Sequence, residues 1–264
     1  MNFAFCLEML YSDLPFIDRL AQAKKDGINS IEFWDWRNKD LRALKDEMQK
    51  LEMKVCNISG NRNFGMIDPH EKNDFLNEVK QTAVATKELD CPTLMLLVQK
   101  LEQPDNRGKL PSVALSYEEI EANIITIGKE IGKIADELNL NIVIEPLNDA
   151  LDHHDYLLNS SAMGFRIIKA INHPRVKLLY DIYHMAMQDE DIFGDVENNL
   201  QQIGYFHIAD KPGRNEPGTG EIDYTRMLEV LKQKNYQGTV GFELAPRYDT
   251  DRAVKAIFKL INHV

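Results

Sequence analysis

Four acidic or imidazole side chains recur along the second half of the chain at similar intervals. Glu145, Asp181, His207 and Glu243 are separated by 36, 26 and 36 residues, and each stands near the end of a short apolar segment. Three carboxylates and one imidazole brought together would repel one another and resist burial unless a cation neutralised them. Oxygen ligands with one nitrogen suit Mn²⁺ or Mg²⁺, and the imidazole leaves Co²⁺ and Zn²⁺ open.

The elements that must position these residues follow from the hydropathy pattern. Short apolar segments alternate with long amphipathic ones along the whole chain, which is typical of βα units around a parallel sheet. One repeat takes about 34 residues, close to the roughly 31 of a 250-residue eight-unit barrel. We therefore predict a single (β/α)8 TIM barrel over residues 1–264. The expected strands are 3–7, 30–34, 54–58, 93–98, 141–145, 177–181, 205–208 and 239–243.

Helix signals support this order of elements. Apolar residues at helical spacing run through 120–138, and Ser116 with Glu119 forms a capping box before them. The alternative fold is a doubly wound sheet, which usually carries a glycine-rich phosphate turn after its first strand. Residues 6–10 read Cys-Leu-Glu-Met-Leu, so the barrel is favoured.

In a barrel, the four residues would meet at the carboxyl ends of successive strands, where active sites of this fold lie. Taken singly, each has an ordinary structural explanation as a salt-bridged or buried polar residue, but their coincidence favours a metal site. A cation that chelates a carbonyl and a neighbouring hydroxyl acidifies the C–H bond between them. We expect Glu145 and Glu243, on opposite sides of the substrate, to remove and return that proton.

Three segments carry a resemblance to a known family: Ile-Glu-Pro-Leu-Asn at 144–148, Tyr-Asp-Ile-Tyr-His-Met at 180–185, and the proline- and glycine-containing stretch 209–224. They resemble the hydroxypyruvate isomerase family, which belongs to the xylose isomerase-like barrels together with ketose 3-epimerases and endonuclease IV. The resemblance implies a divalent metal on the four residues above and an isomerase or epimerase proton transfer. It also implies that His184 binds substrate and that Arg214 and Glu216 lie on a loop that closes the pocket.

Several further side chains are candidates for substrate contact. Arg214 suits bidentate binding of a carboxylate, with Lys211, Arg62 and Arg107 as further candidates. Trp34 and Phe64 suit an apolar wall for a sugar chain, with core packing as the alternative. His184 has the alternative of capping the following helix. His153 and His154 are expected only as lid contacts, and the polar segment 99–116 as a lid or a subunit contact.

Composition limits the remaining partners. The chain has 31 basic and 42 acidic residues, a formal net charge of −11, and no basic block, so we expect no nucleic acid partner. We find no signal-peptide pattern and no run of 18 apolar residues, so we expect no membrane and a cytoplasmic enzyme. Whether it acts as a single subunit or a homo-oligomer stays open.

The predicted function is a divalent-metal-dependent isomerase acting on a small hydroxy-carbonyl compound, either a hydroxypyruvate-type keto acid or a sugar. The alternative is a ketose 3-epimerase, which the histidine at 207 and the loop 59–69 favour. An endonuclease IV-like enzyme would need further histidines at the ends of the second and third strands, which read Phe33-Trp34 and Asn57-Ile58-Ser59. A non-catalytic sugar-binding barrel is the remaining possibility.

Overall fold

Eight parallel strands close into a barrel in the computed structural model, which describes residues 1–263. Around the ring the order is β1-β10-β9-β8-β7-β4-β3-β2, which follows the chain. This confirms the predicted (β/α)8 barrel. The barrel strands are β1 (Asn2–Cys6), β2 (Ser30–Phe33), β3 (Lys54–Ser59), β4 (Thr93–Leu97), β7 (Asn141–Glu145), β8 (Val176–Asp181), β9 (Ile203–Ile208) and β10 (Thr239–Phe242).

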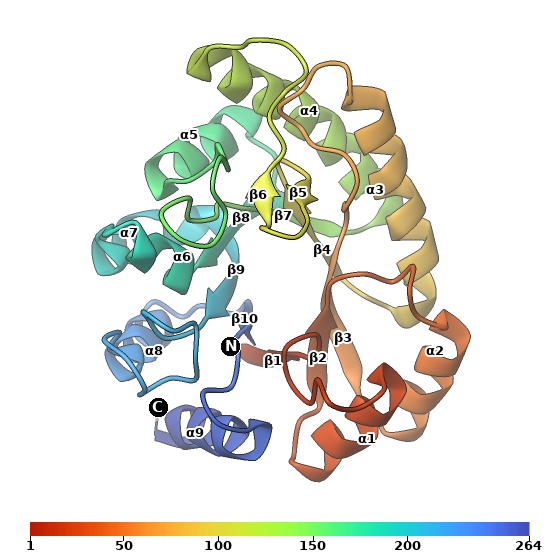
Figure 1. Ribbon diagram of the computed structural model, residues 1–264, viewed down its shortest axis with the longest axis vertical. Coiled ribbons are helices and arrows are strands. Elements are labelled where there is room, and N and C mark those ends of the chain that lie inside the picture. The colour runs from red at the N-terminus through yellow and green to blue at the C-terminus, as the bar shows by residue number, and fades with distance from the viewer. Residues whose placement is uncertain (264) are drawn as a thin grey trace.

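Helices surround the strands on the outside of the ring (Figure 1). Their inward faces and the strands bury a continuous apolar core. None of the helices in residues 1–263 combines the length and apolarity needed to cross a membrane. The helices are α1 (Phe16–Lys25), α2 (Leu41–Lys50), α3 (Lys72–Thr86), α4 (Tyr117–Leu138), α5 (Ser161–Ile171), α6 (Ile182–Met187), α7 (Ile192–Asn199), α8 (Tyr224–Gln233) and α9 (Thr250–His263), with short 3₁₀ turns η1 (Lys87–Leu89) and η2 (Leu200–Gln202).

β7 has the predicted bounds, and the other strands differ from the predicted ones by one or two residues. Glu243 follows β10 instead of ending it, because the chain leaves the ladder there to enter a loop. The helix signals were confirmed where a cap is present: the Ser116 side chain and Glu119 form the reciprocal capping box of α4. Asp181 caps α6 by accepting from the backbone N–H of His184, so the last residue of β8 also begins the next helix.

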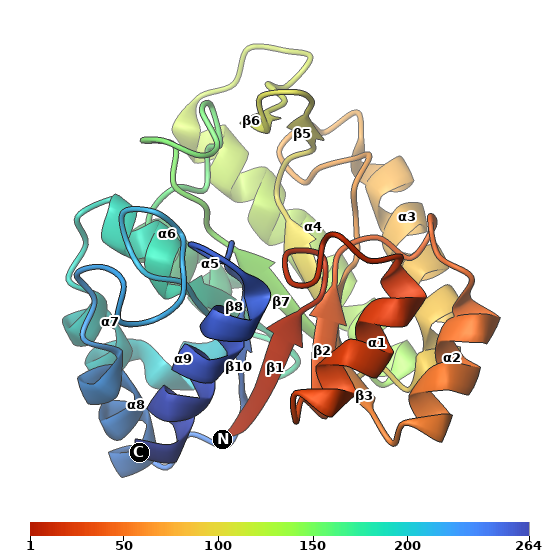
Figure 2. The same cartoon turned by 60° about the horizontal axis from the view of Figure 1, so that its bottom comes forward.

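The long segment 99–116 contains a hairpin that the sequence did not predict. Its strands are β5 (Leu101–Glu102) and β6 (Arg107–Gly108), which pair antiparallel. The hairpin lies beyond the arrowheads of β1 and β2 in Figure 2. Gly108 N–H donates to the carbonyl of His154 at 2.8 Å, which ties the hairpin to the loop after β7. The two long loops therefore support each other above the carboxyl ends of the strands.

Candidate active site

The four predicted ligands come together at the carboxyl ends of four neighbouring strands. One potential ligand atom from each of Glu145, Asp181, His207 and Glu243 lies within 4.8 Å of the others, and all four residues are buried. His207 Nδ1 faces the carboxylates, 3.2 Å from Glu145 Oε1, 3.7 Å from Glu243 Oε2 and 4.0 Å from Asp181 Oδ2. We refer to these four residues as the ligand cluster.

Strand register places the cluster at one level of the barrel. Asp181 is the last residue of β8 and lies level with His207 of β9. His207 in turn lies level with Gly241 of β10, and side chains two residues apart on a strand point the same way. Glu243, two residues beyond Gly241, therefore points to the same side as that position. Glu145 completes the set as the last residue of β7.

Burial and mutual repulsion shift the protonation of the cluster. Burial raises the pKa of Glu145 to about 7 and that of Asp181 to about 6. Burial alone would lower the pKa of His207, but the charges of Glu32 and Glu243 raise it well above its ordinary value. Burial alone would raise the pKa of Glu243, yet His207 and Arg214 lower it. Protons and Arg214 thus offset the negative charge, and a cation would displace those protons.

A divalent cation fits this donor set. Asp181 Oδ2 is buried and accepts no hydrogen bond, whereas buried carboxylate oxygens ordinarily have a donor. Its other oxygen, Oδ1, accepts from the backbone N–H of His184 at 3.1 Å, so the side chain is held and only Oδ2 is left for another partner. Three carboxylates and an imidazole are ligands of hard and borderline dications.

A further buried carboxylate, absent from the predicted set, lies on the far side of the His207 ring. Glu32 Oε1 of β2 is 3.2 Å from His207 Nε2, and Glu32 Oε2 accepts from the Tyr205 hydroxyl at 2.7 Å. A Cβ at Gly241 would lie 2.7 Å from both carboxylate oxygens, so a glycine is needed there. Glu32 favours the proton of a neutral His207 ring on Nε2, which leaves the Nδ1 lone pair facing the cluster.

His184 is fully buried beside Asp181, and Asn148 determines its tautomer. Asn148 Oδ1 accepts from the backbone N–H groups of Leu151 and Asp152 at 3.1 and 3.0 Å, so its amide nitrogen faces His184 Nδ1 at 2.6 Å. The ring therefore accepts at Nδ1 and carries its proton on Nε2. Nε2 has no hydrogen-bond partner and lies 3.7 Å from Asp181 Oδ2. Burial lowers the pKa of His184 well below its ordinary value, so a neutral ring presents one N–H beside the cluster.

Arg214 reaches the cluster from the loop after β9. Its Nη2 pairs with Glu243 Oε2, and its guanidinium lies 5.6 Å from the centroid of the Tyr183 ring. The Asp210 carboxylate anchors this loop by accepting the backbone N–H groups of residues 218, 220 and 222 at 2.9 to 3.1 Å. Arg214 has a φ of 54°, a left-handed conformation that costs a non-glycine residue about 1–2 kcal/mol. The anchored loop holds this conformation and turns the guanidinium inward.

The remaining substrate-binding candidates divide into two groups. Trp34 lies at the cluster, where its Nε1 donates to Glu243 Oε1 at 2.7 Å. Glu216 is buried farther out, and its carboxylate accepts from the backbone N–H of Arg247 at 2.9 Å. Phe64 packs against the core and, like Glu216, does not line the cavity beside the cluster. The structure thus brings His184, Arg214 and Trp34 to the cluster but leaves Glu216 and Phe64 outside it.

A cavity of about 90 Å³ adjoins the cluster, far smaller than the 300–1,000 Å³ or so of sites for drug-sized ligands. His153, expected only as a lid contact, is buried and lines it. The ring is held there because its Nδ1 lies 3.0 Å from the carbonyl oxygen of Asn106 in the β5–β6 hairpin, a contact with no sequence signal. The lining residues are Trp34, Arg62, Met95, Leu97, Leu101, Asn106, Glu145, Leu147, His153, Arg214 and Glu243.

Comparison with known proteins places this site in a family. The chain matches the family described as Xylose isomerase-like TIM barrel over residues 20–261. It is 27% identical over 263 residues to the hydroxypyruvate isomerase of Escherichia coli (strain K12), covering 97% of both chains. It is 26% identical over 258 residues to the 2-oxo-tetronate isomerase of Cupriavidus necator, covering 94% of both.

Solved structures agree with this fold. An AP endonuclease, family 2, from Brucella melitensis has a TM-score of 0.86 at 22% identity and covers 98% of both chains. A D-psicose 3-epimerase from Clostridium cellulolyticum H10 has a TM-score of 0.78 at 17% identity, over 99% of this chain and 92% of that one. The full-length relatives are isomerases, and the present enzyme is an isomerase. The chain belongs to the xylose isomerase-like TIM barrel family.

Proposed function

We propose that this enzyme is a divalent-metal-dependent isomerase that moves a proton between neighbouring carbons of a small hydroxy-carbonyl compound. The observation that carries the proposal is the buried convergence of Glu145, Asp181, His207 and Glu243 at the carboxyl ends of four strands. A dication held by these residues would supply Lewis-acid stabilisation for the enediolate charge that develops when the substrate loses its proton.

Glu145 and Glu243 are the groups proposed to move the proton. β7, which ends in Glu145, and β10, which precedes Glu243, are separated in the ring by β8 and β9, so the two carboxylates approach a substrate from different sides. Each carboxylate would hold the cation through one oxygen and use its other oxygen as the base. Return by the same carboxylate to the neighbouring carbon gives isomerisation, and return by the opposite carboxylate to the other face of the original carbon gives epimerisation.

Two further groups are proposed to hold the substrate's oxygens. The Nε2–H of His184 is buried beside Asp181 without a hydrogen-bond partner, so a substrate hydroxyl or carbonyl oxygen would satisfy it. The guanidinium of Arg214 lines the cavity and already lies against Glu243, where it stabilises negative charge at the cluster. Both groups act without moving a proton of their own.

The small cavity favours a short substrate. About 90 Å³ beside the cluster suits a compact hydroxy-carbonyl compound better than a long sugar chain. Hydroxypyruvate and 2-oxo-tetronate, the compounds in the names of the two full-length relatives, are compact and carry the required neighbouring oxygens. We therefore propose substrates of this hydroxy-keto-acid type.

The test is proton exchange at the substrate carbon. Mn²⁺-loaded protein is incubated with hydroxypyruvate or 2-oxo-tetronate in deuterated water, and deuterium entry and product formation are followed by NMR against a protein-free control. We expect deuterium at the carbon beside the carbonyl together with the isomeric product. Absence of both with these acids and with tagatose and psicose would refute the proposal.

A ketose 3-epimerase is the second candidate. The histidine in the ligand set and the fold likeness to a D-psicose 3-epimerase favour it. Faster turnover of tagatose or psicose than of the keto acids would select this alternative. The same panel of substrates therefore distinguishes the two candidates in one experiment.

A further inference from the structure

Two guanidinium groups line the cavity, and they differ in their partners. Arg214 pairs with Glu243. Arg62 lies 6.0 Å from the centroid of the Trp34 ring, and no carboxylate of residues 1–263 lies within 4.0 Å of its guanidinium. An arginine at the wall of a cavity, without an acidic partner, is available to an anionic ligand.

The loop that carries Arg62 is held by a buried carboxylate. Glu78 of α3, 4% exposed, accepts from the backbone N–H groups of Arg62, Asn63 and Phe64 at 3.1 to 3.2 Å. It also accepts from the Asn63 amide at 2.8 Å and from Arg37 Nη2 at 2.7 Å. Charge-assisted hydrogen bonds to three consecutive N–H groups fix the backbone of this loop.

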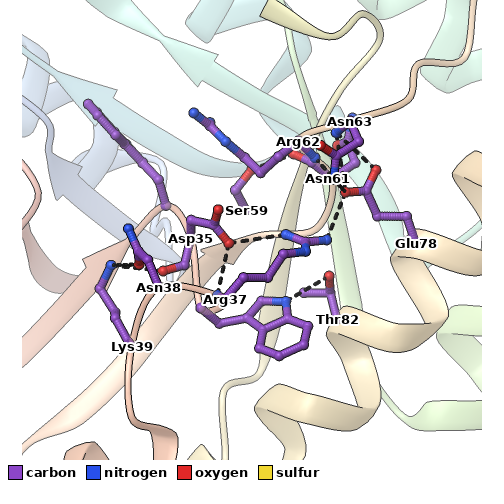
Figure 3. A network of polar contacts seen from close by, with 12 residues as sticks. Asp35, Arg37, Asn38, Lys39, Ser59, Asn61, Arg62, Asn63, Glu78 and Thr82 are labelled. Atoms are coloured by element: carbon purple, nitrogen blue, oxygen red, sulfur yellow. Dashed lines mark hydrogen bonds and ion pairs between the residues drawn. The ribbon is translucent and has the colours of Figure 1, made fainter.

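The direction of the Arg62 side chain follows from this attachment. Figure 3 shows Glu78 reaching the loop from α3, while the Arg62 side chain extends away from it. The backbone of Arg62 is therefore fixed by Glu78, and its guanidinium is left to line the cavity. Arg37 supplies the positive charge that Glu78 needs, so Arg62 itself is not used for that purpose.

The carboxylates near the cavity have partners other than Arg62. Glu32 accepts from Tyr205 and lies beside His207. Asp152 accepts from the Tyr183 hydroxyl at 2.8 Å and from the Asn148 amide at 2.7 Å. The negative charge of the carboxylates in the ligand cluster would be offset by a dication and by Arg214. Arg62 is then the cation that a substrate, and not the protein, would neutralise.

We propose that Arg62 determines substrate specificity by binding the carboxylate of an acidic substrate, and that Glu78 is the residue that positions it. This inference rests on the proposed isomerase function and deepens it, because it assigns selection of acids over neutral ketoses to one side chain. From the sequence, we predicted Arg214 as the carboxylate-binding residue, with Arg62 as a further candidate. The structure reverses the order because Arg214 is engaged with Glu243.

The test uses a pair of ligands that differ only in charge and cannot be isomerised. D-Glycerate and D-glyceramide share their hydroxyls, but the amide replaces the carboxylate and neither has a ketone. Isothermal titration of each into Mg²⁺-saturated protein measures the preference for the acid. We expect wild-type protein to bind glycerate about tenfold to a hundredfold more tightly, which corresponds to hydrogen bonds to a charged group.

Arg62→Met should remove this preference, with glyceramide affinity within about twofold of wild type. Arg62→Lys should keep part of it, because lysine retains the charge but loses the planar fork. Arg42→Met is the matched control, since Arg42 is exposed on α2 and its loss removes the same charge. A wild-type protein without preference, or an Arg62→Met protein that keeps it, would overturn the inference.

Glu78→Gln tests the positioning role. Glutamine keeps the size of the side chain but places an N–H₂ group against the backbone N–H donors, so the glycerate preference should fall about three- to tenfold in protein that still unfolds cooperatively. An unchanged preference in this variant would show that Glu78 does not position Arg62. Deuterium exchange into the substrate is measured separately with wild-type protein. Absence of exchange in wild-type protein that still prefers glycerate would refute only the proposed isomerase function.

Discussion

The two sides of the barrel hold their site residues in different ways. On the side of β7, β8, β9 and β10, each strand delivers one member of the ligand cluster at or just beyond its last residues. On the side of β2 and β3, the cavity-lining residues Trp34 and Arg62 lie on loops after the strands. Strand register determines the position of the ligand cluster. The buried carboxylate of Glu78 on α3 determines the position of the Arg62 backbone.

This difference assigns catalysis to the strand ends and substrate selection to the loops. Strand ends are rigid, and the cluster that they form suits proton transfer, which requires reacting groups to be placed accurately. Loops vary more readily without loss of the fold, so a wall built on loops is suited to choosing among substrates. We call β7 to β10 with the ligand cluster the ligand half, and the loops after β2 and β3 the wall half. We expect substitutions in the ligand half to abolish turnover, and substitutions in the wall half to alter substrate preference or to lower the rate more moderately.

The largest effect is expected from the two proton-transfer glutamates. Glu145→Gln or Glu243→Gln keeps the shape of the side chain but removes the base, so deuterium exchange into the substrate should fall by about 10²- to 10⁴-fold. NMR in deuterated water with Mn²⁺-saturated protein measures this. Exchange near the wild-type rate in either variant would contradict the role given to that residue.

Glu32 links the two sides of the barrel. It belongs to β2, yet it lies beside His207 Nε2. Glu32→Ala should weaken Mn²⁺ binding about 10- to 100-fold, as is typical when the partner of a metal-binding histidine is lost, while Glu32→Gln should retain more because it keeps an acceptor.

Titration calorimetry of metal-stripped protein measures these affinities. Glu137→Ala is the matched control, since Glu137 is exposed on α4 and its loss should leave binding unchanged. Equal Mn²⁺ affinity in Glu32→Ala and wild-type protein would show that Glu32 does not orient the imidazole.

A smaller effect is expected from Trp34→Phe. Phenylalanine keeps an aromatic wall but loses the Nε1–H that donates to Glu243 at 2.7 Å, so kcat should fall about two- to tenfold for acidic and neutral substrates alike. Steady-state kinetics on both substrate classes measures it. Trp36→Phe, which loses only a hydrogen bond to Thr82, should leave kcat unchanged, and a larger effect from Trp36 than from Trp34 would contradict this assignment.

The ligand half could be predicted from sequence because its positions follow from periodicity alone. A strand that ends in a polar residue after an apolar run places that residue at the rim of a barrel, which is how Glu145 and Asp181 were found. Glu32 carried a weaker signal as the only charged residue of segment 30–34. Its contact with His207 joins strands 175 residues apart and depends on barrel closure, which no local pattern specifies.

The wall half could not be predicted to the same degree, because loop positions depend on tertiary anchors. Phe64 is placed by Glu78 and Glu216 by Arg247, and both side chains lie outside the cavity lining. His153 is placed in the cavity by the carbonyl of Asn106 in the β5–β6 hairpin, which had no sequence signal. Phe64, Glu216 and His153 have in common that each lies on a loop.

The most direct test of the account is binding of a dication to the ligand cluster. Mn²⁺ is titrated into metal-stripped wild-type, Asp181→Asn and His207→Ala proteins, with binding followed by calorimetry and thermal unfolding. The account predicts one ion per wild-type chain, a higher unfolding temperature with Mn²⁺, and a large loss of affinity in both variants. No binding by wild-type protein, or equal binding by all three proteins, would contradict it.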